Sequence, residues 1–192
     1  MHTVVATLFV MVVLFVLLES HVTGFWWFPL LYASIALHEV GHLIAGKLVG
    51  MEAGGIVVGG LMLLKSGGRW RWHFDYRRIL SGGLAKPLPR KTDFDPARYA
   101  WMLAGGPLTN ILLAVVSGIV FWRTGGALEW MGTVFWINVI LFAGTLIPTA
   151  GGNKSDGARL WILLRNEQES RLWIALLQLM TEDKWRAAAR LG

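Results

Sequence analysis

The stretch ALHEVGHLIAG, residues 36–46, places two histidines and a glutamate in a run of Ala, Leu, Ile and Val residues. On a helix, residues four positions apart share a face, so His38 and His42 direct two imidazoles at the same point. Glu39 lies on the same side, close enough to reach a water molecule there. Ionisable groups in an apolar helix are costly unless a partner satisfies them. The HExxH spacing predicts two zinc ligands and a general base.

The composition around this stretch is that of a membrane protein. Of the 192 residues, 55% are hydrophobic and only 16% are charged, and the mean hydropathy is +0.52. These values are wrong for a soluble domain. The first apolar segment lacks the basic start and small-residue cleavage site of a signal peptide, so we expect a retained helix. Four segments are long enough to approach the roughly 20 helical residues that span a bilayer: residues 3–18, 25–49, 99–122 and 130–148.

The basic residues predict how these segments cross the membrane. Nine Lys and Arg residues lie in the connector at residues 50–98 and seven more follow residue 150, whereas the short links at 19–24 and 123–129 hold one between them. The positive-inside rule therefore places both basic segments and both termini in the cytoplasm. The net charge of +6 is then explained by basic residues that set the topology and contact the headgroups of the lipid bilayer. We therefore expect no nucleic-acid partner. We predict a multi-pass protein of a prokaryotic cell membrane whose site faces the cytoplasm.

The connector contains short runs that predict a small β element at the membrane interface. One run is GGIVVGG at residues 54–60, and the other is RWRWHF at residues 69–74, whose alternation gives one Trp-rich face. Residues 81–98 are rich in Gly and Pro and predict a loop. The tail at residues 156–191 predicts two amphipathic helices with a break near 165–170.

These segments combine into a predicted fold. We expect an α-helical polytopic membrane protein with about four transmembrane helices and the interfacial β element. A membrane domain would cover residues 1–157, including the connector, and a cytoplasmic helical tail would cover residues 158–192.

A catalytic zinc usually takes three protein ligands, so a third must come from elsewhere in the chain. Cysteine is absent, which leaves carboxylates and the remaining histidines. Asp156 follows the last predicted span at its cytoplasmic end, where Pro148 and nearby glycines would break the helix and let the backbone turn back. Four other carboxylates compete with it: Glu52, Asp75, Asp93 and Asp95.

Three motifs together carry a resemblance. HEVGH (38–42) in a membrane helix, AGGPLTN (104–110), and LIP (146–148) followed by SDG (155–157) resemble the site-2 protease family of intramembrane zinc metalloproteases. The resemblance covers roughly residues 35–159. It implies that His38, His42 and Asp156 bind zinc and that Glu39 activates water. It also implies that the substrates are membrane-spanning proteins or peptides, cut within or near the bilayer.

Two positions depart from the pattern of that family. Its members commonly carry Asn where Thr145 stands, and an aspartate five residues after the proline, whereas Asp156 lies eight residues after Pro148. Thr145 could still donate one hydrogen bond to a substrate. Asn110, in AGGPLTN, is a second candidate substrate contact, although an asparagine in a membrane helix also serves as an interhelical hydrogen-bonding residue.

A helical substrate must unwind before a peptide bond becomes accessible, and an exposed strand edge can hold the unwound segment. We predict that Ile56, Val57 and Val58 supply this edge, because they are apolar and follow the HEVGH helix closely. Two other functions fit parts of the sequence. One is a membrane-anchored zinc peptidase of another HExxH family with a glutamate as third ligand, and the other is a carrier or assembly factor that performs no hydrolysis.

Overall fold

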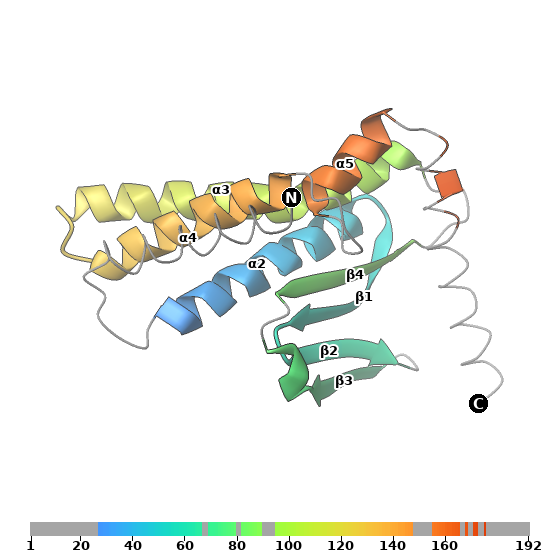
Figure 1. Cartoon of the computed structure of the whole chain (residues 1–192), viewed down its shortest axis with the longest axis horizontal. Coiled ribbons are helices and arrows are strands. Elements are labelled where there is room, and N and C mark those ends of the chain that lie inside the picture. The colour runs from blue at the N-terminus through green and yellow to red at the C-terminus, as the bar shows by residue number, and fades with distance from the viewer. Residues whose placement is uncertain are drawn as a thin grey trace.

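The protein is described by a computed structural model that covers residues 27–66, 69–79, 82–89, 95–147 and 155–165, together with residues 168, 171, 172 and 175. Three long helices lie side by side with a small sheet beneath them (Figure 1). They are α2 (Trp27–Leu48), α3 (Pro96–Arg123) and α4 (Glu129–Leu146), and each is long and apolar enough to cross a membrane. They correspond to the last three predicted spans. The first predicted span, residues 3–18, lies outside the described residues, so a fourth helix stays a prediction.

The outer surfaces of the three helices are apolar and exposed, as expected where lipid tails surround a protein. Exposed side chains larger than alanine include Leu37, Ile44, Leu48, Leu108, Leu112, Val115, Val116, Ile119 and Trp136. The buried polar residues of these helices face inward instead. This distribution is the reverse of that in a soluble helical bundle and is consistent with a membrane location.

Helices α2 and α3 approach each other closely at glycines. A Cβ added at Gly105 would lie 2.6 Å from the Cβ of Ala45 and would also collide with the backbone carbonyl of Gly41. Small residues allow this close approach, as is common between membrane helices. Because Gly41 lies between Glu39 and His42, the contact brings the functional turn of α2 against α3.

The sheet contains four antiparallel strands in the order β3-β2-β1-β4. The strands are β1 (Met51–Val58), β2 (Leu61–Ser66), β3 (Arg69–Phe74) and β4 (Gly83–Pro89). Strand β1 starts directly after α2 through Gly50, whose φ of 90° favours glycine. The predicted β element is therefore present, with β1 beginning before the GGIVVGG run and ending within it at Val58.

Strand β4 corrects the sequence analysis, which predicted a loop at residues 81–98. Residues 83–89 instead pair with β1 over its whole length, from Val58 with Gly83 to Met51 with Pro89. Prolines suggested a loop because proline cannot donate a ladder hydrogen bond. In an edge strand, however, alternate N–H groups point away from the neighbouring strand, and a proline at such a position costs no ladder bond.

Helix α5 (Asp156–Arg165) confirms the first helix predicted for the tail. The second predicted tail helix falls largely outside the described residues. Helix α5 lies against α3 and near the end of α4 (Figure 1). This packing brings the start of α5, at Asp156, next to these two helices.

Candidate metal centre

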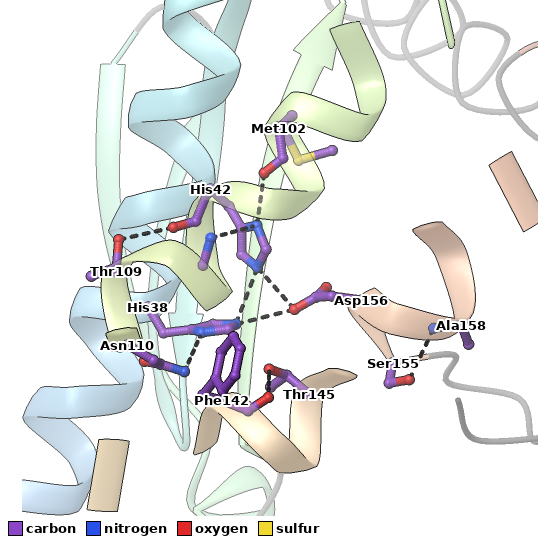
Figure 2. Close-up of polar contacts among 12 residues, drawn as sticks. His38, His42, Met102, Thr109, Asn110, Phe142, Thr145, Ser155, Asp156 and Ala158 are labelled. Carbon is purple, nitrogen blue, oxygen red and sulfur yellow. Dashed lines mark hydrogen bonds and ion pairs between the residues drawn. The ribbon is translucent and has the colours of Figure 1, made fainter. Parts of the chain in front are cut away.

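His38 and His42 lie one turn apart on α2 and point to the same place (Figure 2). Their Nε2 atoms are 3.1 Å apart, and each residue is about 5% exposed. The two rings meet edge to face, with centroids 4.7 Å apart. The helical spacing thus converges two imidazole nitrogens, as the sequence predicted.

Asp156 completes a three-residue set from the far end of the sequence. Its Oδ2 lies 3.2 Å from Nε2 of His38 and 3.2 Å from Nε2 of His42. A tetrahedral zinc ion with ligand distances of about 2.0–2.1 Å would hold its ligand atoms about 3.3 Å apart. The separations of 3.1 and 3.2 Å are close to that value. In the described part of the chain, these three side chains form the group that could hold a metal ion.

A glycine keeps space at these nitrogens. A Cβ added at Gly106 of α3 would lie 2.6 Å from His38 Nε2 and closer still to His42 Nε2. Any larger residue would occupy the volume beside the ring nitrogens. The donor set and this space both fit a zinc ion.

Two contacts fix the start of α5 against the end of α4. The Ser155 hydroxyl donates a hydrogen bond to the Ile147 carbonyl at 2.7 Å and accepts one from the Ala158 N–H at 3.2 Å. A Cβ added at Gly157 would collide with the backbone of Leu146. Ser155 therefore caps the helix, and Gly157 lets it approach α4 closely. The residues on either side of Asp156 thus hold its carboxylate at the histidines.

The environment of Asp156 favours its ionised form. Burial raises the pKa of the Asp156 carboxyl, but hydrogen bonds with His38 and His42 outweigh this effect and leave the pKa below its usual value. An ionised carboxylate beside two imidazoles is the protonation state that a metal ligand requires.

The second nitrogen of each ring also has a partner. His42 Nδ1 lies 2.9 Å from the carbonyl oxygen of Met102, and His38 Nδ1 lies 2.9 Å from the side-chain amide of Asn110. Both partners belong to α3. Such contacts orient the ring of a metal-binding histidine and select its tautomer.

Glu39 lies between the histidines and strand β4. It is 7% exposed, and its carboxylate accepts a hydrogen bond from the backbone N–H of Ala85. A Cβ added at Gly83 would lie 2.7 Å from the Cγ of Glu39. Strand β4 therefore passes directly over the glutamate, and only a residue without a side chain fits at position 83.

A cleft of about 450 Å³ opens beside these residues. His38, Glu39, His42 and Asp156 line it together with β4 residues, α4 residues and Arg159 of α5. It is large enough to admit a short extended peptide segment. The cleft joins the three-residue set, the glutamate and the edge of the sheet in one site.

The competing carboxylates have other roles. Asp75 accepts a hydrogen bond from the Arg77 N–H at 3.0 Å, and Asp95 caps α3 by accepting one from the Ala97 N–H at 3.0 Å. Glu52 forms an ion pair with Lys65 at 3.5 Å. Asp93 lies outside the described residues. Among the described candidates, Asp156 is thus the carboxylate that reaches the histidines.

The sequence model of peptidase family M50, the site-2 protease family, matches residues 27–126, more than half of the chain. This chain belongs to peptidase family M50. The resemblance found in the sequence is thereby confirmed, and the family is one of membrane-bound zinc metallopeptidases. No curated protein and no solved structure gives a significant match. The matched range contains His38, Glu39 and His42 but ends before Asp156, which is placed at the site by the geometry alone.

In this M50 chain, the remaining predicted site residues have different environments. Thr145 lines the cleft, and its hydroxyl donates a hydrogen bond to the Phe142 carbonyl at 3.2 Å. A substrate would have to compete for this proton. Asn110 is fully buried behind His38 and is not among the cleft residues. Its predicted contact with substrate is therefore not supported by its position.

The predicted docking edge at Ile56, Val57 and Val58 does not hold. Strand β1 lies inside the sheet, and these three residues pair with β2 on one side and β4 on the other. An added strand would have to displace one of these neighbours. Val57 does line the cleft.

Sequence reasoning missed β4, which forms the edge beside Glu39. Its signal was available in the sequence, because GLAKPLP at residues 83–89 alternates apolar residues with prolines that fit one side of an edge strand. The partner strand could not be recognised without the fold.

Proposed function

We propose that this M50 chain is an intramembrane zinc endopeptidase that cleaves membrane-spanning proteins or peptides within or near the bilayer. The observation that carries this proposal is the convergence of His38, His42 and Asp156 at 3.1–3.2 Å, with Glu39 beside them on one cleft. Two of these ligands and the glutamate lie on a helix that could cross a membrane. A cleft at that depth is suited to substrates that are themselves in the membrane.

The proposed reaction is hydrolysis of a peptide bond. When bound by the three ligands, zinc lowers the pKa of water and polarises the scissile carbonyl. Glu39 accepts one proton from the attacking water and passes a proton to the leaving amine as the C–N bond breaks. The Ala85 N–H orients the Glu39 carboxylate toward the cleft. The water oxygen remains on the new carboxylate, and the atoms of one water molecule are divided between the two products.

We further propose that the unwound substrate pairs with the outer edge of β4 at Gly83, next to Ala85, whose N–H is already used by Glu39. This edge lies beside Glu39, whereas β1 has no free edge. Pairing would replace the helical hydrogen bonds that the substrate loses when it unwinds. The prolines at positions 87 and 89 limit the pairing to the end of β4 nearest the glutamate.

The charge distribution supports an orientation in which the connector faces the cytoplasm. In that orientation, the cytoplasmic end of α2 leads into the sheet, and water would enter the cleft from the cytoplasm. We propose a prokaryotic cell membrane as the location. An impermeant thiol reagent applied to intact cells that carry a single cysteine at position 91 tests the orientation, and labelling from outside would contradict it.

Metal analysis of the purified protein tests the ligand set. The native chain should contain one zinc per molecule, and His38→Ala, His42→Ala and Asp156→Ala should each lose it. Glu52→Ala is a matched control, because this carboxylate pairs with Lys65 on the sheet and should leave zinc content unchanged. Zinc retained in both histidine variants would overturn the site.

Comparison of membrane proteomes tests the reaction. Cells that express the native chain should accumulate shortened products of membrane proteins that are absent from cells with Glu39→Gln. Equal product patterns, with zinc bound in both proteins, would favour the carrier or assembly role over hydrolysis.

A further inference from the structure

Asn110 is a fully buried residue whose role is not explained by the cleft. It lies on α3, its exposed fraction is 0%, and it does not line the cleft. Its side-chain amide lies 2.9 Å from Nδ1 of His38 (Figure 2). Because Asn110 does not line the cleft, its direct link to the site is its contact with His38.

The orientation of the Asn110 amide leaves one atom unsatisfied. The amide NH₂ faces His38, and Oδ1 has no hydrogen-bond partner among the described residues. A half turn about the Cβ–Cγ bond would exchange the two groups and present the oxygen to the same ring nitrogen.

The geometry of His38 decides which orientation suits a metal. Its Nε2 faces His42 and Asp156, so a zinc ion at this set would take the Nε2 lone pair. A neutral imidazole bound through Nε2 carries its proton on Nδ1. That proton needs an acceptor, which the amide oxygen is and the amide NH₂ is not.

We propose that Asn110 is a positioning residue that presents its carbonyl oxygen to His38 Nδ1–H and so holds the Nε2 lone pair toward the metal. It would do for His38 what the Met102 carbonyl does for His42, whose Nδ1 is 2.9 Å from that oxygen. The two partners lie on the same helix, so α3 orients both histidines of α2. The inference rests on the proposed zinc site and adds to it the α3 groups that contact the histidines at Nδ1.

A second buried asparagine provides a matched control. Asn138 of α4 is also 0% exposed, and its NH₂ donates to the Ser34 hydroxyl at 3.1 Å and to the Val134 carbonyl at 2.8 Å. Neither partner is a histidine. Asn138 therefore shares the residue type, the burial and the helical setting of Asn110, but joins α2 to α4 without a hydrogen bond to a metal ligand.

The test compares Asn110→Asp, Asn110→Leu and Asn138→Leu in the purified full chain, with zinc affinity measured by competition with a chelator. The Asp variant keeps an acceptor and lacks a donor, so it should bind zinc at least as tightly as the native chain. The Leu variant should bind about 10–100-fold more weakly, the usual effect of losing such a partner. Asn138→Leu should leave zinc affinity within about twofold, whatever it does to thermal stability.

Substitution of zinc by Co²⁺ adds a readout that general destabilisation would not change. The visible absorption of bound Co²⁺ should be native-like in Asn110→Asp and altered in Asn110→Leu. A folded Asn110→Asp protein that binds zinc ten times more weakly than the native chain would overturn the inference, and this comparison suffices if the Leu variant does not fold. Native affinity in folded Asn110→Leu would also overturn it. Absence of zinc from the native chain would instead reject the zinc site itself.

Discussion

The two edge strands of the sheet, β3 and β4, differ in almost every respect although they belong to one sheet of four strands. All six residues of β3 are exposed, and they alternate Arg and His with Trp and Phe. Strand β4 lies over Glu39 and lines the cleft. One edge is suited to contact with the membrane interface, whereas the other is suited to the substrate.

The difference between them shows how position in a sheet determines function. Both strands have one side that no other strand of the sheet pairs with, but of the two only β4 is next to the helix that carries the glutamate and histidines. Strand β4, GLAKPLP, has no aromatic side chain and lies at the site. Strand β3, RWRWHF, is rich in aromatic and basic side chains and lies away from it.

The largest effect is expected at the glutamate that β4 covers. Glu39→Gln should retain zinc and reduce cleavage of a substrate found in the proteome comparison by about 10²–10⁴-fold, because the amide cannot accept the proton of water. Turnover by purified protein, with zinc content measured in the same sample, checks this. The Glu52→Gln variant, in which the changed residue lies on β1 and pairs with Lys65, should cleave at the native rate. Near-native turnover by the Glu39 variant would show that Glu39, the residue covered by β4, is not the general base.

A side chain at Gly83 should have the next largest effect. Gly83→Val would push the Glu39 carboxylate away, because even a Cβ at this position would lie 2.7 Å from the Glu39 Cγ. A displacement of about 1 Å at a catalytic group can cost about 10²-fold in rate, so we expect a loss of that order with zinc retained. Gly144→Ala on α4 is the control, since no atom lies within 4 Å of the added Cβ. Equal rates for the two variants would show that β4 does not constrain the glutamate.

Removal of one donor from β4 should have a smaller effect. Ala85→Pro deletes the N–H that binds the Glu39 carboxylate, and a hydrogen bond to a charged group is worth about 1.5–3 kcal/mol. We expect turnover to fall by about 10–100-fold. Ala85→Gly keeps the N–H and should remain within a few-fold of the native rate. A similar loss in both variants would assign the effect to the methyl group rather than to the donor.

The smallest effect is expected on β3. Trp72→Ala removes an exposed aromatic side chain that is 70% accessible, so turnover in lipid nanodiscs should change by less than about twofold. Quenching of tryptophan fluorescence by brominated lipids should decrease, because one ring at the predicted interface is lost. A large loss of turnover in a zinc-loaded Trp72→Ala protein would mean that β3, too, handles the substrate.

The sequence by itself determined the features that repeat along one element. The i, i+4 spacing converged His38 and His42, apolar length identified α2, α3 and α4, and the alternation at residues 69–74 identified β3. These features depend only on the geometry of a single helix or strand, so the sequence contains all the information they need. Asp156 was selected among several carboxylates by the resemblance, and the caps made by Asp75 and Asp95 explain why those two do not compete with it.

Tertiary structure decided everything that depends on which elements become neighbours. Strand β1 had the apolar, β-branched sequence expected of a docking strand, yet pairing on both sides gives it no free edge. Strand β4 resembled a loop because proline has no N–H to donate. The cost of that missing donor depends on whether a neighbouring strand needs a hydrogen bond at the same position. Asn110 resembled a substrate contact or an interhelical bond until the α2–α3 crossing placed it on His38. A hydrogen bond between residues 72 positions apart is set by the packing of two helices, and no local pattern in the sequence encodes it.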